Sequence, residues 1–201
     1  KEREIAQNYS DEEILANVAL GYLRGGVTVS EMAACYQIFA AEGIYTGLYS
    51  VTGIYDQSGD KIYQVKPEKK RVISTETAFI MNKLLQKVTE PGGTGENAAE
   101  CGIMVAGKTG TTTGSDNWFV GVSPEFSCAV WHGTDQSSPS LKNTAPEIFS
   151  EIIKNITVRP EKSFPLCENV IQKAYCAETG KLLSEDCKKM EVGWFAVGNI
   201  P

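Results

Sequence analysis

Apolar residues recur three and four positions apart in four stretches of the chain, the spacing that places them on one face of an α-helix. Three of these stretches begin with a Ser or Thr followed three residues later by Glu, a pattern that satisfies free N–H groups at a helix start. Gly or Pro follows each of the first three stretches. The sequence therefore predicts four helices with apolar core stripes. They begin at Ser10, Thr28, Ser74 and Thr144, with the stripes Ile14, Val18 and Tyr22; Met32, Cys35, Tyr36 and Phe39; Met81, Leu84, Leu85 and Val88; and Phe149, Ile152, Ile153 and Ile156.

β-branched and aromatic residues fill the intervals between these helices. Residues 45–56 and 61–65 flank the turn Gln57-Ser58-Gly59-Asp60, which is typical of a β-hairpin. Three more strands are predicted between the third and fourth helices, and because short turns join them, we expect them to pair antiparallel. The predicted fold class is α/β in the broad sense, more strictly α+β, with an antiparallel sheet flanked by helices. These three strands span residues 101–111, 117–122 and 127–132.

Length and composition allow one domain with an appendage. The chain has 201 residues, 42% of them hydrophobic, enough for one core of ordinary size. After Pro160 and Pro165 the composition turns polar and cysteine-bearing. The sequence therefore predicts a main domain over residues 1–158 and a cysteine-containing tail over residues 159–201.

Charge and hydropathy argue against nucleic acid as a partner and against a membrane-spanning segment within these residues. The net charge is −6 and the 19 Lys and Arg residues are dispersed, so we do not expect nucleic acid to bind. No apolar run approaches the roughly 20 residues that span a bilayer. Residue 1 is Lys with no signal-like apolar segment behind it, so we expect this chain to be part of a longer polypeptide.

Five of the six cysteines fall into two groups. Cys35 and Cys128 sit in apolar patterns and are predicted to be inert core residues. Cys176 and Cys187 bracket a polar, turn-rich stretch, which suits a disulfide-stapled loop, with Cys167 as a third candidate for the pairing. The only histidine, His132, lies in a strand-like run and no C-x-x-C pair occurs, so neither a metal site nor a cofactor is expected.

The stretch GIMVAGKTG, residues 102–110, fits the phosphate-loop pattern G-x-x-x-x-G-K-[ST]. A phosphate loop must bend around the anion and must then start a helix whose N-terminus faces the phosphates. Residues 103–105 instead predict a buried strand, and residues 109–114, TGTTTG, are poor helix formers. We therefore interpret the stretch as a strand that ends at Lys108-Thr109-Gly110-Thr111.

The end of this strand has a composition suited to binding a carboxylate. Alternation places the Thr109 and Thr111 hydroxyls on one side, and Gly110 exposes backbone that an extended peptide can approach. Lys108 adds a cation next to these hydroxyl donors. The four residues alone favour an ordinary solvated strand end on the surface, so the wider context decides.

Several motifs in order resemble penicillin-binding protein transpeptidase domains. KTGTTTGSDNWFVGV, residues 108–122, is similar to that family's KTGT strand, loop and D-x-WF-x-G strand. GVTVSEMAACYQIFAAEGIY resembles its GVTPLEMA helix, and Gly93-Thr94-Gly95 resembles its GTG loop. YCAETGKLLSEDC followed by VGNIP resembles the tail of class A, bifunctional members. The resemblance implies the C-terminal part of a β-lactamase/transpeptidase-like fold.

The resemblance also implies roles for the strand end. Lys108 would be the electrostatic and hydrogen-bonding partner of an S-x-N serine, and Thr109 and Thr111 would bind the carboxylate of a substrate or β-lactam. The Thr111 N–H would be one oxyanion donor, and Gly110 would let substrate lie along the strand. The implied activity is a serine D,D-transpeptidase that cross-links peptidoglycan stem peptides and is trapped by β-lactam antibiotics.

Part of that machinery is missing from these residues. The S-x-x-K and S-x-N motifs come before the EMA helix in the family, so an upstream segment of the same domain is the implied partner. Ser58-Gly59-Asp60-Lys61 matches S-x-x-K but lies in a predicted turn, and Ser115-Asp116-Asn117 matches S-x-N but follows KTG, so neither is expected to be catalytic. Class A membership would further imply a glycosyltransferase domain, a membrane anchor as the only membrane contact, and a location on the outer face of the bacterial cytoplasmic membrane.

Two other functions stay open at this point. A scaffold or binding module could keep the fold without the nucleophile, and the presence of S-x-x-K upstream would discriminate against it. A β-lactam hydrolase is disfavoured because the class A-like tail has no counterpart there. The departures from the family pattern, Val29 in place of Pro and Ala41-Glu42-Gly43 in place of A-N-G-G, do not touch the implied chemistry.

Overall fold

The computed structural model describes residues 15–16, 18–19, 21, 26–111, 116–134, 144–156, 159–185 and 187–200. Among these residues, every paired strand is antiparallel to its neighbour. No helix among them is both long enough and apolar enough to cross a bilayer. The elements are α2 (Val29–Ala40), β1 (Ile44–Thr46), β2 (Gly53–Tyr55), β3 (Lys61–Gln64), β4 (Lys69–Arg71), α3 (Thr75–Lys87), the 3₁₀ helix η1 (Glu96–Cys101), β5 (Ala106–Thr111), β6 (Asp116–Val122), β7 (Ser127–Gly133), α4 (Ala145–Lys154), β8 (Val170–Cys176) and β9 (Met190–Ala196).

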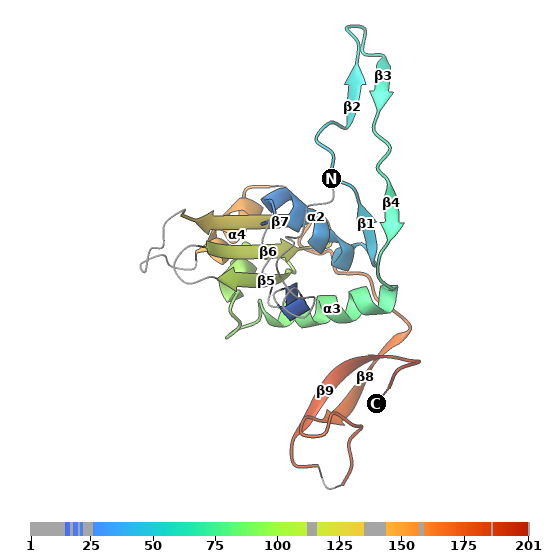
Figure 1. Cartoon of the computed structure of the whole chain (residues 1–201), viewed down its shortest axis with the longest axis vertical. Coiled ribbons are helices and arrows are strands. Elements are labelled where there is room, and N and C mark those ends of the chain that lie inside the picture. Colours follow the sequence, from blue (N-terminus) through green and yellow to red (C-terminus); the bar gives the residue numbers. More distant parts are fainter. Residues whose placement is uncertain are drawn as a thin grey trace.

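The main body of the molecule is built on the three-stranded sheet β5-β6-β7 (Figure 1). β6 is the central strand and pairs along its whole length with β7. The predicted strands 117–122 and 127–132 are confirmed and each gains one residue. The antiparallel sheet flanked by helices is therefore confirmed as the fold class.

The predicted start of the first of these strands was wrong. Residues 96–101 form η1, Gly102 turns the chain with a φ of +77°, and β5 begins only at Ala106. Residues 103–105 cannot join the ladder because the partner strand ends at Val122, opposite Ala106. Val105 is nevertheless buried, so its apolar character serves the core rather than a strand.

Helices cover both faces of this sheet. α4 and η1 lie on one face, where the buried rings of Phe119 and Phe149 meet edge to face with centroids 4.9 Å apart. α2 and α3 lie on the other face, where Leu85 packs with Ala106 and Val122. The first core cluster comprises Ala98, Val105, Phe119, Val130, Ala145, Phe149 and Ile153, and the second comprises Leu85, Ala106, Val122 and Phe164.

α2 begins with the capping box that the sequence predicted. The Thr28 side chain accepts from the Glu31 N–H at 3.2 Å, and the Thr28 N–H donates to Glu31 Oε2 at 2.8 Å. Its core stripe was predicted less well, because Cys35 is exposed and only Ala34 is fully buried. Cys35 is therefore not the inert core residue that its apolar neighbours suggested.

α3 and α4 begin where the sequence placed them, but their buried faces are narrower. In α3, Leu85 is 6% exposed whereas Leu84 is 56% exposed. In α4, Ile152 and Ile156 are likewise exposed beside the buried Phe149 and Ile153. Only part of each apolar stripe therefore packs on the sheet within the described residues. The first predicted helix lies mostly outside the described residues. Its described helical residues are exposed, so Val18 is not a core residue. They are Leu15, Ala16, Val18 and Ala19.

A two-stranded arm extends from the body (Figure 1). Its outer part is the predicted hairpin, in which β2 pairs with β3 around the turn at Gly59. Its inner part pairs β1 with β4, from Ile44↔Arg71 to Thr46↔Lys69. The sequence did not predict β4, because three consecutive cations show no strand alternation.

The C-terminal residues form a separate hairpin, β8–β9, that contacts α3. Trp194 packs edge to face on Phe79 with ring centroids 5.3 Å apart, and the Lys83 ammonium lies 5.4 Å from each ring centroid. Residues 157 and 158 lie outside the described part of the chain, so the domain boundary near residue 158 stays a prediction.

Candidate active-site strand

The residues that the sequence singled out lie at the end of β5. Lys108, Thr109, Gly110 and Thr111 pair in order with Val120, Phe119, Trp118 and Asn117 of β6. β5 is an edge strand, since β6 is its only partner among the described strands. An edge strand presents backbone N–H and C=O groups to which an extended peptide can add as a further strand.

Alternation along β5 sends its side chains to the two faces of the sheet. Thr109 and Thr111 share a face with the buried Phe119 and Asn117, so the prediction that their hydroxyls lie on one side is confirmed. Lys108 lies on the opposite face and is exposed, and its ammonium donates to the Thr109 carbonyl at 2.8 Å. The cation is therefore held at the strand end by a backbone carbonyl, on the face opposite the two hydroxyls.

Gly110 is closely backed by the neighbouring strand. A Cβ at this position would lie 3.3 Å from the Cβ of Trp118, which is itself half-buried. The Trp118 backbone lies directly opposite in the ladder. Any larger residue at position 110 would therefore crowd Trp118 and cover backbone that the glycine leaves accessible.

A residue to which the sequence assigned no role lies next to this strand end. The Thr94 hydroxyl is 2.8 Å from the Thr109 hydroxyl, across 15 positions of sequence. The resemblance had singled out Gly93-Thr94-Gly95 as a loop motif without giving it chemistry. The signal that could have found Thr94 was its place in a Gly-flanked loop directly before the KTG strand.

Of the two motifs that were rejected as catalytic from the sequence, only Ser58-Gly59-Asp60-Lys61 is fully described. Ser58 lies in the turn between β2 and β3, where its N–H donates to Asp56 Oδ1 at 2.9 Å. A turn cannot present Lys61 one helical turn after the serine, as an S-x-x-K nucleophile requires. Ser115 lies outside the described residues, and Asn117 is buried in β6.

No group of three or more His, Cys, Asp and Glu side chains in the described part of the chain could hold a metal ion. His132 fills a strand position in β7, as predicted, and its Nδ1 lies 2.8 Å from the Thr144 hydroxyl. Thr144 therefore makes no side-chain cap to α4, which corrects the third predicted capping box.

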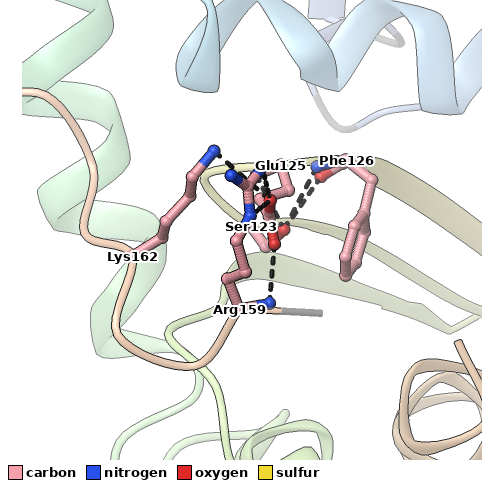
Figure 2. A network of polar contacts seen from close by, with 5 residues as sticks. All are labelled: Ser123, Glu125, Phe126, Arg159 and Lys162. Atoms are coloured by element: carbon pink, nitrogen blue, oxygen red, sulfur yellow. Dashed lines mark hydrogen bonds and ion pairs between the residues drawn. The ribbon is translucent and has the colours of Figure 1, made fainter. Parts of the chain in front are cut away.

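A charged cluster at the β6–β7 turn is structural (Figure 2). The Arg159 N–H donates to Glu125 Oε2 at 2.8 Å, its guanidinium pairs with Oε1, and the Lys162 ammonium lies 3.3 Å from Oε1. The backbone hydrogen bond, followed by the side-chain hydrogen bonds, lowers the pKa of the Glu125 carboxyl to about 2. These contacts tie the turn to the segment that follows α4.

Two of the tail cysteines are neighbours in space. All six cysteines are free thiols, and the side chains of Cys176 and Cys187 are hydrogen-bonded to each other. This contact lowers the pKa of the Cys176 thiol to about 7 and raises the pKa of the Cys187 thiol. The pair is thus placed at the closed end of the β8–β9 hairpin, while the stapled loop stays a prediction.

The sequence and the fold both match known proteins. Residues 3–154 match the model of the penicillin binding protein transpeptidase domain. Penicillin-binding protein 1A of Clostridium acetobutylicum is 38% identical over 159 residues, which are 76% of this chain and 20% of the relative. Penicillin-binding protein 1A of Clostridium botulinum is 34% identical over 177 residues, which are 86% of this chain and 21% of the relative. The chain thus spans about a fifth of the length of these relatives.

Solved structures agree with this assignment. Penicillin-Binding Protein 1A from Haemophilus influenzae shares the fold with a TM-score of 0.71 at 21% identity, over 87% of this chain and 32% of that chain. The D,D-transpeptidase domain of a peptidoglycan glycosyltransferase from Eggerthella lenta has a TM-score of 0.50 at 30% identity, over 63% of this chain and 31% of that chain. Because the family model covers most of the chain, the chain belongs to the penicillin-binding protein transpeptidase family.

Proposed function

We propose that this chain is the C-terminal part of a class A-type peptidoglycan D,D-transpeptidase and forms one wall of its active site. The observation that carries the proposal is the end of the edge strand β5. There the Lys108 ammonium is hydrogen-bonded to the backbone, Thr109 and Thr111 share one face, and Gly110 lies between the two threonines. Transpeptidase family membership and the names of the relatives support the reaction class.

The proposed mechanism divides the chemistry between this chain and an upstream segment that carries S-x-x-K and S-x-N. The serine oxygen of S-x-x-K attacks the carbonyl of the penultimate D-alanine of a stem peptide, and the terminal D-alanine leaves as its amine. A second stem's amine then attacks the serine ester and restores the serine hydroxyl. A β-lactam opens on the same serine and stays attached.

Each residue of the strand end has a separate role in this proposal. The Lys108 cation supports the ionisation and orientation of the S-x-N serine, and the Thr109 and Thr111 hydroxyls bind the terminal carboxylate. The Thr111 N–H donates to the oxyanion together with the N–H of the nucleophile. Gly110 lets the stem peptide lie against the strand, because no side chain stands between them.

We further propose that the longer polypeptide carries a glycosyltransferase domain and an N-terminal membrane anchor, with this part outside the cytoplasmic membrane. Support comes from the relatives, which are about five times longer than the matched region. The name of the Eggerthella lenta protein, a peptidoglycan glycosyltransferase with a D,D-transpeptidase domain, supports the same combination.

The test is cross-linking by the complete polypeptide with a stem peptide ending in D-Ala-D-Ala and an amine acceptor. Mass spectrometry detects the cross-linked product, and a colorimetric assay detects the released D-alanine. We expect both products from the wild type and from Ser58→Ala. Absence of both products, together with no acylation by any β-lactam, would reject the enzyme in favour of a binding scaffold. Rapid hydrolysis of the acylated form would instead indicate a β-lactam hydrolase.

A further inference from the structure

We propose that Thr94 is a positioning residue of this site: its hydroxyl fixes the Thr109 hydroxyl so that the Thr109 proton points to the carboxylate of the bound ligand. The inference rests on the proposed function and assigns chemistry to the Gly93-Thr94-Gly95 loop. Its central observation is the 2.8 Å contact between the two hydroxyl oxygens.

The number of protons that each group can donate sets the direction of this hydrogen bond. A hydroxyl has one proton to donate and two lone pairs, whereas an ionised carboxylate only accepts. When Thr109 donates its proton to the ligand, it can meet Thr94 only as an acceptor, so Thr94 must be the donor. The chain then runs from Thr94 to Thr109 to carboxylate, and each hydrogen bond polarises the next.

The loop that carries Thr94 is fixed in place by backbone hydrogen bonds and by close packing at its two glycines. The Gly95 N–H donates to the Val88 carbonyl at 2.9 Å, and the Gly93 N–H donates to the Glu90 carbonyl at 2.9 Å. A Cβ on Gly95 would lie 2.8 Å from the Phe119 ring, and one on Gly93 would collide with the Val88 carbonyl. Gly95 is therefore required for the loop to sit this close to β6, and Gly93 is required for it to pack against the end of α3.

Thr109 is consequently fixed at two atoms by two different elements. Its carbonyl accepts from the Lys108 ammonium at 2.8 Å, and its hydroxyl meets the loop. Phe119, which lies opposite Thr109 in the ladder, is the same ring against which Gly95 packs. The loop, the strand and the core beneath them thus form one rigid support for the carboxylate-binding hydroxyl. Thr94 itself is exposed, so it stands at the surface from which a ligand arrives.

The experiment compares acylation of the complete polypeptide by a penicillin and by the methyl ester of the same penicillin, which lacks the negative carboxylate. Thr94→Val removes the donor at nearly constant shape, Thr94→Ser restores it, and Thr52→Val is the matched control at an exposed threonine in the arm. We expect Thr94→Val to slow acylation by the free acid about 3- to 10-fold, the loss of one hydrogen bond. The penicillin concentration that gives half the maximal acylation rate should rise, while the maximal acylation rate stays unchanged.

Four results together distinguish positioning from a structural role. Thr94→Ser and Thr52→Val should be acylated at the wild-type rate. The ester should acylate Thr94→Val and the wild type at equal rates. In a Thr109→Val background, Thr94→Val should cause no further loss of rate. Equal losses with acid and ester, or multiplicative losses in the double variant, would overturn the inference. A normal rate for Thr94→Val with the free acid would do the same. If the wild type itself is not acylated, the proposed function fails first and this inference falls with it.

Discussion

Leu85→Ala tests whether the base of the active-site strand is held by α3. Leu85 is 6% exposed and packs in one cluster with Ala106, the first residue of β5. Removing a buried leucine side chain costs about 2–5 kcal/mol through lost burial and the cavity that remains, and we take about 3 kcal/mol for this site. The loosened contact lies directly below the strand that carries Lys108.

Leu84→Ala is the matched control on the same helix, with the same change in helix propensity. Leu84 is 56% exposed, so less than half of its apolar surface is buried. Because full burial of a leucine is worth about 1.5–3 kcal/mol, its removal should cost about 1 kcal/mol or less and leave no closed cavity. The difference between the two variants is therefore about 2 kcal/mol.

Thermal unfolding of both variants, made in the complete polypeptide, measures this difference. In a folding unit of about 150–250 residues, about 1 kcal/mol shifts Tm by roughly 2–4 °C, and a larger unit shifts less, so Leu85→Ala should unfold below Leu84→Ala by up to about 8 °C. Acylation by a penicillin should be lost at a correspondingly lower temperature in Leu85→Ala. Equal shifts, or a larger shift for Leu84→Ala, would show that the helix faces the sheet differently from this structure.

Two further predictions concern the turn cluster and the tail. The folded pKa of Glu125, about 2, lies below its ordinary value of 4.5, so its carboxylate contributes stability that is fully present above pH 4.5 and is lost as pH falls toward 2. The Tm difference between wild type and Glu125→Gln should therefore shrink over that window, and a constant difference would show that the contacts with Arg159 do not stabilise the fold. Oxidised glutathione should take two electrons and two protons from Cys176 and Cys187 to form a disulfide, seen by intact mass as the loss of two hydrogen atoms. Cys167 should stay alkylatable, and its protection in place of either partner would refute this pairing.

The helices and the central sheet could be predicted because local patterns dictate them. The Thr28 capping box formed as the sequence specified, and alternation placed Thr109 and Thr111 on one face of β5. The rejection of a phosphate loop was correct, since Lys108 lies within a strand, although the reason was partly wrong because residues 103–105 are not in the strand. Whether such an apolar run joins a ladder depends on where its partner strand ends, which the run itself does not encode.

Features that depend on contacts with residues distant in the chain could not be predicted from the sequence. Leu84 and Leu85 differ in exposure because only Leu85 faces the sheet beneath α3, a contact between two elements. Thr144 had the pattern of a helix cap, yet its hydroxyl meets His132 on a strand that only the fold brings near. The Thr94–Thr109 contact likewise joins a loop to a strand across η1. Spacing within one element cannot reveal contacts between two.

The most direct test of the central claim is labelling of the complete polypeptide with a fluorescent penicillin, followed by denaturation and location of the label by mass spectrometry. We predict a label on a serine of the upstream S-x-x-K motif in the wild type and in Lys87→Ala, a control at an exposed lysine of α3. Lys108→Ala should lose the label, because the cation that supports the S-x-N serine is gone. A Lys108→Ala variant labelled at the wild-type rate, or a label on Ser58, would contradict the account.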